Sequence, residues 1–190
     1  MTSMLLGLVL FFSAHSLQIA RRVRLSLLER MGTTPYRAVY SIVSLVGLVL
    51  IGFGFADYRS GGLIPVWFPP LWMKHMALLL NWFAIVFFAA AYLPCYIRRT
   101  LRHPMLTGVL ILAITHLLTN GDAGGMILFG TFLFWAVAVR IDTRFRTVDK
   151  SPVRASMLFD FLALAIGSAS YAIIVFWLHP NIFNIPVWPG

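Results

Sequence analysis

Long runs of apolar residues dominate the chain, and short clusters of arginine separate them. Six runs have the roughly 17 to 25 residues that an α-helix needs to cross a hydrocarbon core of about 30 Å. The runs are continuous rather than alternating apolar with polar at every second position, which favours membrane helices over barrel strands. The pattern predicts an all-α, polytopic membrane protein with six transmembrane helices, at about residues 4–20, 36–56, 74–97, 103–119, 122–140 and 156–178.

The positive charges orient this predicted bundle. All but Arg59 and Lys74 of the 15 Lys and Arg residues follow the first, third or fifth run. Positive residues in short loops remain on the cytoplasmic side of a membrane. The distribution therefore predicts that both termini lie on the non-cytoplasmic side.

Composition supports a single transmembrane domain over residues 1–190. The chain is 60% hydrophobic and 11% charged, and its mean hydropathy is +0.86, which excludes a water-soluble domain of this size. The net charge of +9 is explained by topology and by contact with membrane lipid headgroups, so no nucleic-acid partner is expected. The lone cysteine, Cys95, is expected to be a small packing side chain.

Two histidines lie deep inside apolar runs and are the strongest candidates for chemistry. His15 is expected roughly 16 Å below the outer edge of the membrane and His116 roughly 12 Å below it, at a rise of about 1.5 Å per residue. The other histidines, His75, His103 and His179, fall near membrane boundaries. Ionisable residues inside a span usually face a partner, a cavity or a bound group. A planar macrocycle between the first and fourth spans could accept one imidazole on each face.

Haem fits this arrangement better than zinc does. A neutral imidazole is a good iron donor, and its second nitrogen can donate to a carbonyl or hydroxyl group that fixes the tautomer. Tetrahedral zinc requires three or four ligands, and no CxxC or HExxH cluster occurs in the sequence. The residues alone leave an alternative open, in which both histidines merely hydrogen-bond between helices.

Four segments give the chain a resemblance to a known family. It resembles the NnrU family of bacterial inner-membrane proteins and, more distantly, the 15-cis-ζ-carotene isomerases, over residues up to about 140. The matching segments are Ala14-His15-Ser16-Leu17, Tyr36-Arg37-Ala38-Val39-Tyr40-Ser41, Leu101-Arg102-His103-Pro104-Met105 and Thr115-His116-Leu117-Leu118-Thr119-Asn120-Gly121-Asp122.

That resemblance implies a role in denitrification, in nitrite and nitric oxide metabolism. The isomerase relatives hold haem b and use it to isomerise a cis double bond, and the matching histidines here are His15 and His116. The resemblance therefore implies haem b bound by these two residues. It leaves open whether the protein is an enzyme, a redox protein or a non-catalytic assembly protein, and which hydrophobic small molecule could enter between the helices.

Arg102 and His103 form a second candidate site at the start of the fourth span. A guanidinium and an imidazolium at a helix start can bind carboxylates, so we expect them to pair with a haem propionate or with a lipid phosphate. Arg102-His103-Pro104 also resembles a segment of membrane methyltransferases that helps to bind S-adenosylmethionine. That activity is the alternative function, although the acidic residues those enzymes carry later in the chain are not matched.

Two acidic residues are given structural roles. Asp122 follows Asn120 and Gly121 in a tight turn and is expected to cap the fifth helix. Asp160 lies about one turn inside the cytoplasmic boundary, where pairing with Arg154, Arg144 or Arg21 is expected.

Overall fold

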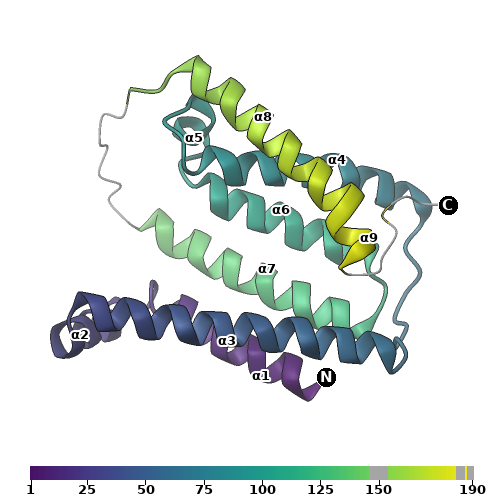
Figure 1. Ribbon diagram of the computed structural model, residues 1–190, viewed down its shortest axis with the longest axis horizontal. Helices are drawn as coiled ribbons and strands as arrows, with labels where there is room; N and C mark the ends of the chain where they lie inside the picture. Colours follow the sequence, from purple (N-terminus) through teal and green to yellow (C-terminus); the bar gives the residue numbers. More distant parts are fainter. Residues whose placement is uncertain (146–153, 183–186, 188–190) are drawn as a thin grey trace. The chain divides into compact units, whose positions relative to one another are not determined.

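The computed structural model describes residues 1–145, 154–182 and 187 and is all-α (Figure 1). Arg146 and Lys150, two of the predicted cytoplasmic cations, lie outside the described residues. The helices are α1 (Thr2–Ser16), α2 (Arg21–Met31), α3 (Thr33–Ser60), α4 (Leu71–Ala90), α5 (Tyr96–Leu101), α6 (Pro104–Thr119), α7 (Ala123–Arg144), α8 (Met157–Ile173), the π-helical η1 (Ile174–Leu178) and α9 (His179–Asn181).

Several helices are long and apolar enough to cross a membrane. Four segments of the described chain qualify by length and composition: α3, α4, α7 and the continuous run Met157–Asn181. The bent pair α1 and α2 would be a fifth, and α6 is apolar but shorter. Phe53 and Phe134 expose 74% and 78% of their surface, which suits contact with lipid better than contact with water. The chain is thus a polytopic membrane protein.

The chain divides into two compact units, Met1–Ile64 and Pro65–Gly190. In the first unit α1 packs along α3, and α2 also contacts α3. Glycines bring the two long helices together. A Cβ placed on Gly47 would lie 2.8 Å from the Phe11 nitrogen, and one on Gly7 would lie 2.6 Å from the Ile51 nitrogen. Such close backbone approach is typical of membrane helix pairs, where small residues form the interface.

We expect Gly47→Ala to destabilise the first unit. The added methyl group has no space, and overpacking of this kind costs about 1–3 kcal/mol. Gly52, on the same helix, has no heavy atom within 4 Å of an added Cβ, so Gly52→Ala is the matched control and carries the same gain in helix propensity. Thermal unfolding of both variants in detergent measures the difference. Equal unfolding temperatures would contradict the tight α1–α3 interface.

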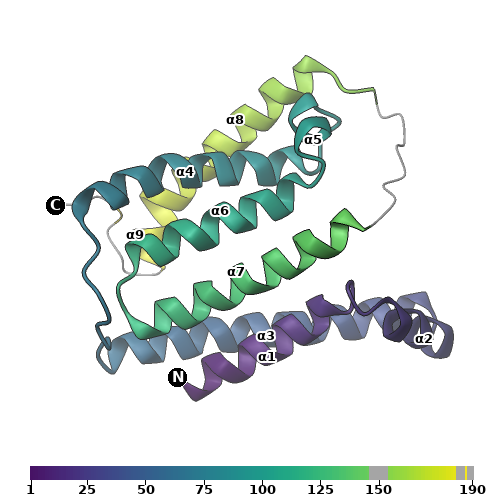
Figure 2. The same cartoon turned by 180° about the vertical axis from the view of Figure 1, so that it is seen from behind.

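In the second unit α4 packs against both α6 and α8, and α7 packs against α6 (Figures 1 and 2). The short α5 contacts α4, α6 and α8. Cys95 is buried with Ala90 and Ala163 in a small core, which confirms its expected packing role. Its sulfur atom also accepts a hydrogen bond from the Arg98 nitrogen at 3.4 Å and so caps α5.

The helix ends differ from the predicted ends at two places. The first predicted span continues to residue 20, but α1 ends at Ser16 and the chain turns by 85° into α2. The third continues to residue 97, but α4 ends at Ala90. Pro94 follows shortly after, and proline disfavours helix at the residue before it and lacks a donor of its own. Neither α2 nor α5 was predicted, because both are polar and lie between apolar runs.

Asp160 corrects a sequence-based expectation. Its two carboxylate oxygens accept hydrogen bonds from the backbone nitrogens of Tyr96 and Ile97, at 3.1 and 2.9 Å, and the expected arginine pairing is not found among the described residues. The first turn of a helix has backbone N–H groups without intrahelical partners, and a carboxylate satisfies them well. Asp160 therefore joins α8 to the start of α5.

The turn between α6 and α7 matches its prediction. Asp122 caps α7 by accepting a hydrogen bond from the Gly125 nitrogen at 2.8 Å. The Gly121 carbonyl oxygen accepts hydrogen bonds from the backbone nitrogens of Val66 and Trp67, at 2.7 and 3.1 Å. An isolated bridge also joins Pro65 to Asp122. The loop that leads into α4 is thus fastened to this turn.

Candidate functional site

His15 lies in the last turn of α1 and has a defined orientation. Its Nδ1 atom lies 2.8 Å from the Phe11 carbonyl oxygen, one helical turn earlier. The ring stacks on Phe11, with 4.0 Å between ring centroids, and the Tyr40 ring of α3 lies 5.4 Å away. A carbonyl oxygen can only accept, so Nδ1 carries the proton in the neutral ring, and Nε2 carries the lone pair.

His116 repeats this local geometry on α6. Its Nδ1 atom lies 2.8 Å from the Leu112 carbonyl oxygen, again one turn earlier. The ring stacks on Phe129 of α7 with 4.3 Å between centroids. Both candidate histidines are half-buried. The two rings therefore share one tautomer, in which Nε2 is the nitrogen able to ligate a metal.

A buried hydroxyl fixes the rotation of α6 beside His116. Thr115 is 1% exposed, and its hydroxyl hydrogen-bonds the Asn81 side-chain oxygen of α4 and the Ile111 carbonyl oxygen. Polar contacts of this kind between membrane helices contribute about 0.6 to 2 kcal/mol. The hydrogen bond between Thr115 and Asn81 therefore also restrains the direction in which the neighbouring His116 points.

His179 is a histidine that the sequence analysis placed apart from the others. It begins α9, and both views show α9 beside the C-terminal end of α6 (Figures 1 and 2). The two rings are close enough for a charge on one to disfavour a charge on the other. The structure thus brings a second imidazole near His116 within the same unit. The sequence analysis predicted the last span up to residue 178, but it could not show which other helix the end of that span approaches.

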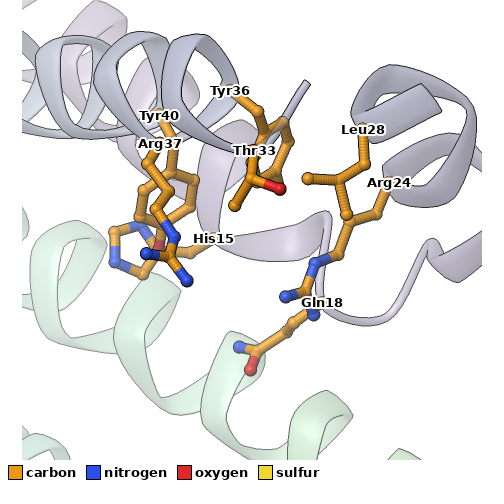
Figure 3. A pocket seen from close by; sticks show the side chains of 8 residues that line it. All are labelled: His15, Gln18, Arg24, Leu28, Thr33, Tyr36, Arg37 and Tyr40. Atoms are coloured by element: carbon orange, nitrogen blue, oxygen red, sulfur yellow. The ribbon is translucent and has the colours of Figure 1, made fainter. Parts of the chain in front are cut away.

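A pocket of about 520 Å³ adjoins His15 within the first unit (Figure 3). Figure 3 shows Arg37 beside His15 and Tyr40 on one side, and Arg24 with Gln18 on the other. The full lining consists of His15, Gln18, Arg24, Leu28, Thr33, Tyr36, Arg37 and Tyr40. Two guanidinium groups and no carboxylate therefore line the space next to His15.

Arg102 and His103 lie at the other end of α6 from His116. Arg102 follows the last residue of α5 and has a φ of 61°. The His103 carbonyl oxygen accepts a hydrogen bond from the Thr107 nitrogen at 3.0 Å. At 1.5 Å per residue, Pro104 and His116 are about 18 Å apart along the helix axis. The structure therefore does not bring Arg102 and His103 together with His116.

The described residues contain no group of three or more His, Cys, Asp or Glu side chains placed to hold a metal ion. A zinc site with three or four protein ligands is accordingly not found in that part of the chain. The candidate metal ligands are single imidazoles with an oriented Nε2 atom, which is the donor that a haem iron takes from a protein.

The sequence analysis did not predict that the residues around His15 form a pocket. Tyr36, Arg37 and Tyr40 stand in one of the segments that carry the family resemblance, but nothing in that segment points to Arg24 or Gln18. The available signal was the proline-free basic stretch after the first span, which could have been assigned to an amphipathic helix folding back toward His15.

Comparison with known proteins gives one family. The family model described as NnrU protein matches residues 3–187 and so spans both units. No curated protein and no solved structure matches the chain.

Proposed function

Because the chain belongs to the NnrU family and is a polytopic membrane protein, we propose that it binds b-type haem in the bacterial inner membrane, with His15 and His116 as iron ligands. The observation that carries the proposal is the geometry shared by the two rings. Each donates Nδ1–H to the carbonyl oxygen four residues earlier and stacks on a phenylalanine.

That shared geometry is what an axial ligand needs. A hydrogen bond at the second ring nitrogen fixes the tautomer and raises the basicity of the ligating nitrogen. Stacking on Phe11 or Phe129 restrains the ring plane, which reduces the entropy lost on ligation. Neither feature is required of a histidine that only hydrogen-bonds between two helices. The two features together therefore support ligation of a metal over that alternative.

When bound, haem would supply an iron centre for redox chemistry, nitric oxide binding or isomerisation of a double bond. The protein's own residues would hold the ring, exclude water and set the ligand basicity. A role in nitrite and nitric oxide metabolism follows from the family resemblance, and isomerisation of a hydrophobic substrate is the second candidate. His179, the imidazole near His116, is the alternative second ligand.

The proposal includes six spans with both termini outside the cytoplasm. Helix α6 has 16 residues, about 24 Å at 1.5 Å per residue. It would therefore cross a core of about 30 Å only with its flanking residues or with local thinning of the bilayer. Arginines cluster after α1, α4 and α7, at the ends that this topology places in the cytoplasm, which supports the orientation.

The absorption spectrum of the full chain, purified from cells supplied with haem, tests the proposal. We expect a Soret band that shifts on addition of dithionite, because iron held by two imidazoles is reducible. Absence of a Soret band would reject haem binding. Binding of S-adenosylmethionine to such haem-free protein would favour methyl transfer, and absence of both would favour an assembly role.

A further inference from the structure

The pocket beside His15 contains two cations and no counter-charge. Arg24 comes from α2 and Arg37 from α3. Within the residues that the structure describes, neither guanidinium lies within ion-pair distance of a carboxylate. Both guanidinium groups are exposed, so water screens their repulsion, but their positive potentials add in the space between them. That space therefore attracts an anion.

The remaining lining is suited to an oxyanion. Gln18, Tyr36 and Tyr40 add an amide and two phenol groups to the two guanidiniums (Figure 3). Guanidinium presents a planar fork of donors that matches the two oxygens of a carboxylate or a phosphate. Figure 3 shows Arg24 and Arg37 on two sides of one space, where both guanidiniums can reach a single bound group.

The place of the pocket in its unit indicates an amphiphile. Helix α2 turns by 85° away from α1 and carries five charged residues among its eleven, Arg21, Arg22, Arg24, Glu29 and Arg30. A helix of this kind lies in the membrane interface rather than in the core. The junction of α1, α2 and α3 therefore joins an apolar helix pair to a charged helix. The apolar side chain of Leu28 and the ring of His15 form the rest of the wall.

We propose that this pocket binds the oxyanion of an amphiphilic molecule between Arg24 and Arg37. Two sources have this chemistry, namely the phosphate of an anionic phospholipid and the carboxylates of a porphyrin. The inference does not require haem to bind, because it rests on the two arginines and on the place of the pocket alone. If haem is the occupant, its carboxylates would lie at the Arg24 and Arg37 end while His15 faces the iron.

Two pairs of probes test the pocket. The two lipids share a phosphate group but differ in net charge, and the two porphyrins differ in having free or esterified carboxylates. Native mass spectrometry of the full chain in neutral detergent compares phosphatidylglycerol with phosphatidylcholine, and haem with haem dimethyl ester. We expect the wild-type chain to prefer the anionic member of at least one pair by about tenfold, since hydrogen bonds to charged groups of this strength correspond to such a ratio. Arg24→Gln/Arg37→Gln should remove the preference.

Arg22→Gln/Arg30→Gln is the matched control, since it removes the same charge from the same basic region outside the pocket. It should keep the preference. Arg24→Lys/Arg37→Lys should keep part of it, and circular dichroism verifies that each variant remains folded. Equal binding of both members of both pairs by the wild-type chain would overturn the proposal. So would an equal loss in the control, which would indicate a general basic surface.

The two pairs of probes also distinguish this inference from the proposal that the protein binds haem. A preference within the lipid pair alone identifies a phospholipid site and leaves haem binding to its own test. A preference within the porphyrin pair alone identifies the carboxylates of haem. If haem and its dimethyl ester bind equally well and the two lipids also bind equally well, the oxyanion site is rejected. Ligation of haem iron by histidine would not be affected by that result.

Discussion

His116→Ala is expected to lower the haem content of the purified protein by more than about tenfold. Loss of partners that only orient a ligating histidine already costs about 10–100-fold in metal affinity, and this change removes the ligand itself. The haem content and the Soret band of the variant, measured against wild type purified in parallel, provide the readout.

Chemical rescue separates loss of a ligand from loss of the fold. His116→Gly leaves space beside Phe129, and free imidazole added to the purified variant should restore the Soret band. His75→Ala changes a histidine in the first turns of α4 that the proposal does not use, and it should retain haem. Loss of haem in the His75 variant, or no recovery with imidazole, would count against ligation by His116.

The second ligand follows from a comparison of His15→Ala with His179→Ala. If His15 is the partner of His116, its loss should change the spin state and shift the Soret band, whereas His179→Ala should leave the spectrum unchanged. The reverse result would assign both ligands to the second unit, where α9, which begins with His179, lies beside the C-terminal end of α6 (Figures 1 and 2). Unchanged spectra in both variants would show iron with a single protein ligand.

The sequence predicts the apolar helices well because their signal is local. A run long enough to cross a membrane must satisfy its backbone within itself, so the apolar length alone locates α3, α7 and the run of α8 and η1 within a few residues, and α4 except for its end. The helix α2 has no such signal. Its charged residues suit a solvated loop equally well, and only packing against α3 distinguishes the two.

The candidate site could be predicted only in part. The rarity of histidine in apolar runs singles out His15 and His116, but their shared tautomer depends on carbonyl distances that spacing does not specify. The pocket joins side chains from three helices. Its second cation, Arg24, follows the bend between α1 and α2, which no residue pattern predicts. The role of Asp160 was predicted wrongly because a carboxylate near arginines suggests an ion pair, while the open N-terminus of α5 was not foreseen.

Gly121→Ala is expected to destabilise the second unit by about 3 kcal/mol. A Cβ at this position would overlap the carbonyl oxygen of Trp67, so the loop would have to move away from the turn. That movement breaks the two hydrogen bonds from Val66 and Trp67, at about 1 kcal/mol each, and the remainder is the cost of displaced backbone. For a chain of this size the loss corresponds to a fall of about 10 °C in the apparent Tm.

Gly130→Ala provides the control, because no heavy atom lies within 4 Å of a Cβ added there. It lies inside α7, where alanine favours helix over glycine by up to about 1 kcal/mol, so its apparent Tm should equal or exceed that of wild type. The two variants are compared at one heating rate in one detergent, since unfolding of membrane proteins is often irreversible. A Gly121→Ala variant as stable as Gly130→Ala would mean that the loop before α4 does not depend on the α6–α7 turn. Since Gly121 lies only five residues after His116, a destabilised turn should also release the end of α6, and we expect haem content to fall in Gly121→Ala and not in Gly130→Ala.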